Sequence, residues 1–294
     1  MSRKTLFTGA GTALITPFTE DGVNFDALGK IIDFQIDNSI DALIICGTTG
    51  EAATMPDKEH LSVIEYAVKR ANGRVPVIAG TGSNDTAHCV ELSVEAERLG
   101  ADGLLITTPY YNKASQKGLL MHYDKIMEKT NAPIILYNVP SRTGMSYQID
   151  TLKELAKCDQ ISAIKEASGS ISYLTEVVKA CPDLTVYSGN DDMIVPLLSM
   201  GGKGVISVLS NICPKETHEL CQKFFDGDIK GSLKLQLDYL DLVNALFCEV
   251  NPIPVKTAMN LMGFDAGCLR LPLCEMGDAT LARLKSAMAE KGLI

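Results

Sequence analysis

ALIICGTTGE, residues 42–51, is a short aliphatic run that ends in a glycine-rich turn. Short runs of this kind are typical of parallel strands that are buried on both faces of a sheet. The pattern recurs along the chain and, with Ala42–Cys46, gives eight predicted strands, the others being Thr8–Ile15, Pro76–Ala79, Gly103–Thr107, Ile134–Tyr137, Ile161–Lys165, Thr185–Ser188 and Gly204–Ser207.

Longer amphipathic segments lie between the predicted strands. In Asp26–Ser39, for example, Leu28, Ile32 and Ile36 fall on one stripe, which is the pattern of a helix that packs against a core. Alternation of strand and helix over eight units predicts an α/β fold, a closed (β/α)8 TIM barrel. An open dinucleotide-binding sheet is the weaker alternative, because GTGSND at residues 80–85 has Asp in place of the third glycine of that fingerprint.

The predicted barrel is complete near residue 226. We therefore expect residues 1–226 to form the barrel and residues 227–294 to form a C-terminal helical extension packed on it. The helical patterns of the extension cover Leu233–Phe247, Pro254–Leu261 and Ala279–Lys291. No segment rich in Pro, Gly or Ser separates the two parts as a linker would.

The composition excludes several classes of partner. The 294 residues include 36 acidic and 27 basic side chains, which give a formal net charge of −9. This charge repels a phosphate backbone and no basic run offsets it, so nucleic-acid binding is not expected. No segment approaches the roughly 20 apolar residues that cross a bilayer. We expect a soluble, cytoplasmic protein without a membrane partner.

Nine cysteines and four histidines are scattered along the chain. They form no C-x-x-C motif and no pair at the spacing of metal ligands, so neither a disulfide framework nor a metal site is predicted. Reduced and mostly buried thiols are the expectation.

Lys165 lies at the end of a predicted aliphatic strand, where barrel enzymes place their catalytic groups. Ile161, Ala163 and Lys165 alternate onto one face, so an inward Ala163 would place the lysine at the open end of the barrel. Burial disfavours a charged amine, and a neutral amine can attack a ketone to form a Schiff base. The alternative is a structural ion pair with Glu166 or with a carboxylate on a neighbouring strand.

Two other strand ends carry polar side chains suited to the same chemistry. Tyr137 ends the adjacent strand, about 5 Å away, and its phenol could move protons during imine formation. Thr48 and Thr49 lie in a turn bounded by glycines, which could hold a carboxylate. Arg142 offers parallel donors to a second carboxylate. The structural alternatives are a core aromatic residue, an ordinary turn and a solvated arginine.

Several strings of the sequence occur together, in an order and at a spacing that extend over essentially the whole chain. They are GTTGE (47–51), TPYYN (108–112), YNVPSRTG (137–144), the strand of Lys165, Ser188-Gly189 and GVISV (204–208). Together they resemble the dihydrodipicolinate synthase family. The resemblance implies a Schiff-base lyase that condenses pyruvate with L-aspartate 4-semialdehyde on the route to diaminopimelate and lysine. It also implies no metal or organic cofactor, and a homo-oligomer that is a tetramer or at least a dimer.

The resemblance also implies roles for individual residues. Lys165 forms the imine with pyruvate, and Tyr137 exchanges protons through a relay completed by Thr48 and Tyr111. In the family the tyrosine matching Tyr111 comes from a neighbouring subunit. The implied substrate-binding residues are Thr49, Arg142, Gly189 and Ile206, of which Arg142 holds the carboxylate of the semialdehyde.

A regulatory pocket is implied less completely. Lysine-sensitive members bind lysine at a subunit interface, and the matching positions here are Ala52, Asp57, His60, Asn84, His88 and Tyr110. Ala52, Asp57 and His88 stand where those members carry Ser, His and Glu. Loss of the Glu removes a carboxylate that could pair with the ammonium of lysine, so we expect weak or absent inhibition by lysine.

Two other functions remain as alternatives. One is a related Schiff-base enzyme, such as N-acetylneuraminate lyase or a keto-sugar-acid aldolase, although such enzymes typically differ at the second Thr of Thr48-Thr49 and around Arg142. The other is a non-catalytic barrel that binds a small anion. Such a barrel would have no need of Lys165 or Tyr137.

Overall fold

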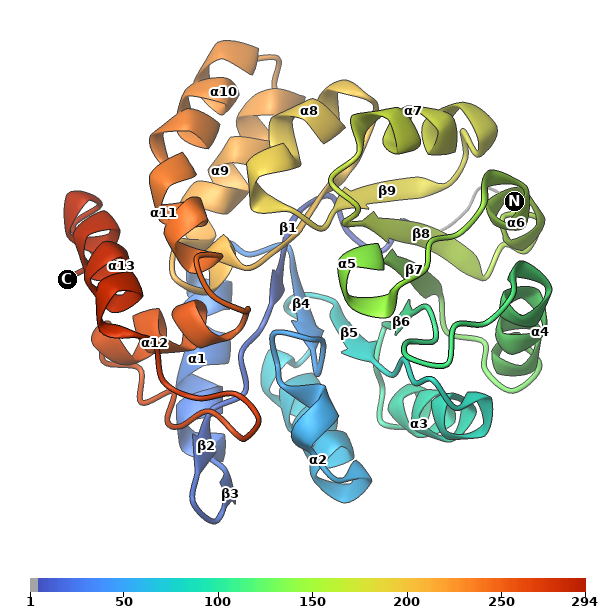
Figure 1. The fold of residues 1–294 in the computed structure, drawn as a ribbon, viewed down its shortest axis with the longest axis horizontal. Coiled ribbons are helices and arrows are strands. Elements are labelled where there is room, and N and C mark those ends of the chain that lie inside the picture. The colour runs from blue at the N-terminus through green and yellow to red at the C-terminus, as the bar shows by residue number, and fades with distance from the viewer. Residues whose placement is uncertain (1–4) are drawn as a thin grey trace.

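The computed structural model describes residues 5–294. The first four residues of the predicted barrel segment 1–226 lie outside the described residues. Eight parallel strands form a closed barrel, as predicted (Figure 1). The predicted bounds differ from the observed ones only at the strand ends. The barrel strands are β1 (Gly9–Ala13), β4 (Ala42–Ile45), β5 (Val77–Gly80), β6 (Gly103–Thr107), β7 (Ile134–Asn138), β8 (Ile161–Glu166), β9 (Thr185–Ser188) and β10 (Gly204–Ser207).

A helix follows each barrel strand and lies on the outside of the barrel (Figure 1). These helices are α1 (Phe25–Asp37), α2 (Asp57–Ala71), α3 (Thr86–Arg98), α4 (Gln116–Met127), α6 (Ile149–Leu155), α7 (Ile171–Ala180), α8 (Ile194–Ser199) and α9 (Pro214–Phe225). Two short features were not predicted. They are a hairpin of β2 (Phe18–Thr19) with β3 (Gly22–Val23), and the single turn α5 (Pro140–Thr143) after β7.

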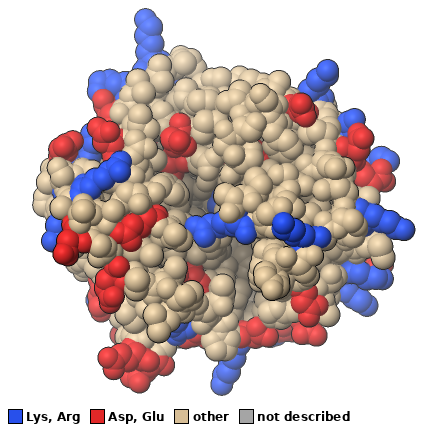
Figure 2. Space-filling model, in the orientation of Figure 1, with Lys and Arg blue, Asp and Glu red and all other residues tan. Residues whose placement is uncertain are grey.

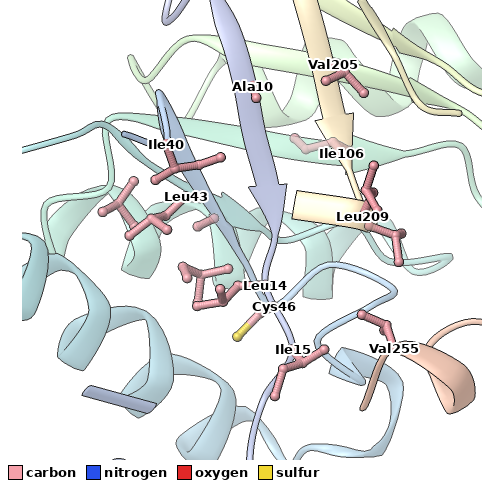
Figure 3. Close-up of a cluster of buried hydrophobic side chains, with 14 of the residues drawn as sticks. Ala10, Leu14, Ile15, Ile40, Leu43, Cys46, Ile106, Val205, Leu209 and Val255 are labelled. Carbon is pink, nitrogen blue, oxygen red and sulfur yellow. The ribbon is translucent and has the colours of Figure 1, made fainter. Parts of the chain in front are cut away.

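The barrel strands separate two apolar clusters, because successive side chains point to opposite faces. The inner cluster fills the barrel and includes Ile44, Ile78 and Ile135. The outer cluster lies between strands and helices, and Figure 3 shows part of it, with Leu43 and Val205 among its strand residues. Because both faces are covered, every residue of the barrel strands except Thr107 is buried, and β4 to β7 are the strands richest in aliphatic residues.

The face assignment in β8 is partly wrong. Ile161 pairs with Ile134 and Ala163 with Ile135, so Ser162 is an extra residue in β8 at that point. A bulge of this kind breaks the alternation of faces. Ile161 therefore joins the outer cluster, whereas Ala163 points into the barrel. The alternation from Ala163 to Lys165 thus gives the inward face of the lysine correctly, but the alternation from Ile161 does not.

The residues after α9 form α10 (Ile229–Asp238), α11 (Leu240–Leu246), α12 (Ile253–Leu261) and α13 (Asp278–Glu290). The single helix predicted over 233–247 is wrong, because the chain breaks at Tyr239. The break lets α10 pack on α9 while α11 packs on α13. One straight helix could not make both contacts. None of the helices within residues 5–294 is long and apolar enough to cross a membrane.

Candidate active site

Lys165 and Tyr137 are directly paired neighbours on β8 and β7. The Nζ atom of Lys165 lies 4.3 Å from the centroid of the Tyr137 ring, and both side chains are less than 10% exposed, at 6% and 8%. No carboxylate within residues 5–294 forms an ion pair with this lysine. The amine is therefore buried beside a phenol and forms no ion pair with the described residues.

The structural alternative for Lys165 was an ion pair with Glu166 or with a carboxylate on a neighbouring strand, and Glu166 points elsewhere. Glu166 accepts hydrogen bonds from Asn138 Nδ2 at 2.7 Å and from the N–H of Ser168 at 2.6 Å. Burial raises the pKa of this carboxyl, and the two hydrogen bonds oppose the increase. Glu166 thus fixes the ends of β7 and β8 rather than neutralising the lysine.

Asp191, which the sequence did not single out, lies in the short turn after β9. Its buried carboxylate accepts from Ser207 Oγ at 2.5 Å and from the N–H groups of Val208 and Leu209 at 3.0 and 3.1 Å. Burial raises the pKa of Asp191, while these bonds and the positive charge of Lys165 oppose the increase. Asp191 therefore fixes the chain at the end of β10 and places a negative charge within electrostatic range of the lysine.

A cavity of about 480 Å³ opens at the carboxyl ends of the strands. Its wall includes Thr48, Tyr137 and Arg142, whereas Lys165 is not part of the wall and lies against the ring of Tyr137. Figure 2 shows a hollow near the middle of this face with basic side chains beside it, although the chain is acidic overall. Both substrates that the resemblance implies carry carboxylates. For their binding, the local charge at the cavity matters more than the net charge of the chain.

The turn after β4 carries Thr48 and Thr49. Gly50 packs closely there, because a Cβ atom would lie 3.1 Å from the carbonyl oxygen of Leu14. Thr49 is buried behind the cavity wall, and its Oγ1 accepts a hydrogen bond of 2.9 Å from Asn251 Nδ2. The turn is thus held from the C-terminal extension, a contact that the sequence did not predict.

Glu51 ends this turn in a left-handed conformation, with φ of 55°. Its carboxylate forms a fully buried ion pair with Lys256 of α12, with Oε1 2.6 Å from Nζ. The second oxygen accepts from the N–H of Arg270 at 3.0 Å. Burial lowers the pKa of Lys256, and Glu51 opposes that decrease. No local pattern in the sequence links two residues that are 205 positions apart.

Arg142 lies on α5 and lines the cavity. One guanidinium nitrogen, Nη2, donates to the backbone oxygen of Asn251 at 3.0 Å. The remaining N–H groups of an arginine anchored in this way can bind a carboxylate.

The other predicted substrate-binding residues are placed differently. Gly189 packs so closely that a Cβ atom would lie 2.5 Å from the Cβ of Ala167. Ile206 belongs to the inner cluster of the barrel. Tyr111 is 91% exposed, has a φ of 70°, and is absent from the cavity wall of its own chain.

The predicted regulatory positions form part of the same cavity. Its wall includes Ala52, Asp57, His60, His88 and Tyr110, whereas Asn84 lies outside it. His88 contacts Asp57, with Nε2 2.9 Å from Oδ1. His60 donates from Nε2 to a backbone oxygen at 2.8 Å, and burial lowers its pKa, which keeps it neutral near pH 7.

Comparison with known proteins gives a consistent picture. A sequence model of the dihydrodipicolinate synthetase family matches residues 6–291. A protein of Acetivibrio thermocellus named 4-hydroxy-tetrahydrodipicolinate synthase is 58% identical over 293 residues, which cover 99% of this chain and 100% of the relative. A crystal structure of a dihydrodipicolinate synthase has a TM-score of 0.96 at 47% identity, covering 98% of this chain and 100% of the other. The corresponding structure from Thermotoga maritima has a TM-score of 0.96 at 40% identity, covering 99% and 100%.

Proposed function

The chain belongs to the dihydrodipicolinate synthetase family, and on that premise we propose that it condenses pyruvate with L-aspartate 4-semialdehyde to give 4-hydroxy-tetrahydrodipicolinate. This reaction leads to diaminopimelate and lysine. The observation that carries the proposal is the buried amine of Lys165, which forms no ion pair within residues 5–294 and contacts the phenol ring of Tyr137.

Lys165 supplies the nucleophile. Its neutral amine attacks the keto carbon of pyruvate, and loss of water from the carbinolamine leaves an imine. Loss of a proton from the methyl group then gives an enamine, whose carbon attacks the aldehyde of the second substrate. Finally, the amino group of that substrate closes the ring at the imine carbon and releases Lys165. The lysine is regenerated, so the cycle balances without an oxidant or reductant.

Tyr137 exchanges the protons of these steps. Its ring contacts the amine and lines the cavity, and in the proposed mechanism its phenol protonates the departing hydroxyl and the new alkoxide. Thr48 lies in the same wall, and we propose that it extends the relay. Tyr111 is too exposed to act within its own chain, and we propose that it completes the relay of a second copy in a homo-oligomer, a dimer or tetramer.

The two carboxylates bind at different places. Thr49 and the adjacent turn hold the carboxylate of pyruvate beside Gly189 and Ile206, and Arg142 holds that of the semialdehyde at the entrance of the cavity. The imine accepts the electron pair that remains when the methyl group loses its proton, which gives the enamine. This chemistry therefore needs no metal or organic cofactor.

We place this reaction in the cytoplasm. All nine cysteines are free thiols, which is the usual state in a reducing compartment. As part of the proposal, residues 1–226 supply the imine-forming barrel and residues 227–294 close one side of the site.

Trapping with borohydride tests the proposal. Pyruvate and borohydride together are expected to leave a stable adduct on the protein, and peptide mapping is expected to place it at Lys165. Without borohydride, adding the semialdehyde is expected to yield the cyclic product. An adduct at another lysine, or an adduct without condensation, would contradict the assignment.

The alternative functions make different predictions. A related aldolase would form the same adduct but would accept a sugar aldehyde in place of the semialdehyde, so product analysis with each aldehyde separates the two. A non-catalytic anion-binding barrel would form no adduct. The names of the relatives favour the condensation.

Lysine is expected to inhibit weakly or not at all. The proposed pocket has His88 where a carboxylate would be needed, and His88 contacts Asp57 instead. Steady-state rates with L-lysine at millimolar concentration are expected to stay near those without it. Inhibition in the micromolar range would contradict this prediction.

A further inference from the structure

Asn251 of the C-terminal extension contacts both residues that the proposed function assigns to substrate carboxylates. Its side-chain Nδ2 donates to Thr49 Oγ1 at 2.9 Å. Its backbone oxygen accepts from Arg142 Nη2 at 3.0 Å. Asn251 itself lies in the cavity wall and is only 8% exposed. One residue outside the barrel thus joins the two anion-binding positions.

The direction of the first hydrogen bond determines what Thr49 can do. A hydroxyl has one hydrogen to donate and two lone pairs. Because the amide of Asn251 donates to Thr49 Oγ1, a lone pair is occupied and the hydroxyl hydrogen stays free. Within residues 5–294 that hydrogen has no acceptor. A carboxylate, which only accepts, is the complementary partner.

A second contact joins the extension to the turn of Thr49, close to Asn251 in sequence. The ion pair of Glu51 with Lys256 joins the same turn to α12, which starts two residues after Asn251. Both side chains are at most 1% exposed. The distance between Asn251 and Thr49 is therefore fixed by the fold and does not depend on a mobile surface segment.

We propose that Asn251 is a positioning residue that orients the hydroxyl of Thr49 toward the carboxylate of pyruvate. The inference rests on the proposed function, because Thr49 binds pyruvate only if that function holds. The side chain of Asn251 serves the pyruvate site, whereas its backbone oxygen serves Arg142. Substitution of the side chain therefore separates the two substrates.

The test is the effect of Asn251→Ala on the two KM values. The KM for pyruvate is expected to rise about 10-fold, the usual effect of losing a hydrogen bond that supports a charged group. The KM for the semialdehyde is expected to stay within about twofold, because alanine keeps the backbone oxygen, and kcat is expected to change less than the KM for pyruvate. Asn260→Ala, which removes a hydrogen-bonded asparagine of α12 outside the cavity, is the matched control with unchanged KM values.

A double-mutant cycle distinguishes orientation of Thr49 from a general effect on the fold. Thr49→Val is expected to raise the KM for pyruvate, and adding Asn251→Ala to it is expected to raise that KM no further. A full 10-fold rise in the Thr49→Val background, or an equal rise in the KM for the semialdehyde, would overturn the role of Asn251.

Asn251→Asp covers the case in which the alanine variant does not fold. Aspartate has nearly the same shape but cannot donate, so it would take the hydroxyl hydrogen of Thr49 and raise the KM for pyruvate at least as much. Kinetics like those of the unsubstituted protein would overturn the proposal. Borohydride trapping of the unsubstituted protein is read separately: no adduct at Lys165 would mean that the proposed function fails, whatever the variants show.

Discussion

Replacing Lys165 by Ala is expected to abolish condensation. The imine cannot form without the amine, and loss of a covalent nucleophile costs roughly 10⁶-fold in kcat in enzymes where it has been removed. Pyruvate with borohydride is expected to leave no adduct. The measurements are the rate of product formation and the mass of the protein after trapping. Because the side chain is buried in the barrel, a thermal unfolding curve must accompany them.

Tyr137→Phe is the matched variant for this experiment. It keeps the ring beside Lys165 and removes only the phenol oxygen, so pyruvate is still expected to label the lysine. Turnover is expected to fall by roughly 10²–10⁴-fold, the usual contribution of a positioned acid or base. Substantial condensation by Lys165→Ala, or full activity of Tyr137→Phe, would contradict the proposed mechanism.

Replacing Lys256 by Met is expected to destabilise the protein strongly. The substitution leaves the carboxylate of Glu51 buried without its cation, and breaking one side of a buried ion pair costs about 3–5 kcal/mol. Chemical denaturation measures this loss as a lower free energy of unfolding. Activity is also expected to fall, because Glu51 ends the turn that carries Thr48 and Thr49.

Two variants show whether the charge of Glu51 causes this loss. Adding Glu51→Gln to Lys256→Met removes the unpaired charge but keeps an oxygen for the N–H of Arg270, so most of the stability is expected to return. Lys153→Met breaks an exposed pair and is expected to change the free energy of unfolding by less than about 0.5 kcal/mol. A loss below about 1 kcal/mol for Lys256→Met would contradict the prediction, because breaking a buried pair costs more than that.

The barrel could be predicted from the sequence because its pattern is local. Most of the strands are short runs rich in aliphatic residues, as expected for strands buried on both faces. Lys165 stands out for the same reason, as a lysine within such a run, and Tyr137 follows from its place at the end of the next strand. The break at Tyr239 could not be predicted, because it follows from which helices pack together.

The contacts of the extension could not be predicted because they are made between distant parts of the chain. Asn251 lies in the turn before α12 and Lys256 lies within that helix, and nothing near them in sequence indicates a catalytic turn. Asp191 was missed for a related reason: its donors, Val208 and Leu209, belong to the next strand-helix unit. Propensity and periodicity describe neighbours in sequence, whereas these residues are defined by neighbours in space.

The ion pair of Glu51 with Lys256 also bears on how the chain folds during its synthesis. The ribosome releases the N-terminal part of a protein first, so all eight barrel strands emerge before Lys256 does. Until α12 follows, Glu51 lacks the cation with which it pairs. The nascent barrel can therefore assemble most of its strands early, but the buried pair that fixes the turn of Thr48 and Thr49 forms only when α12 arrives.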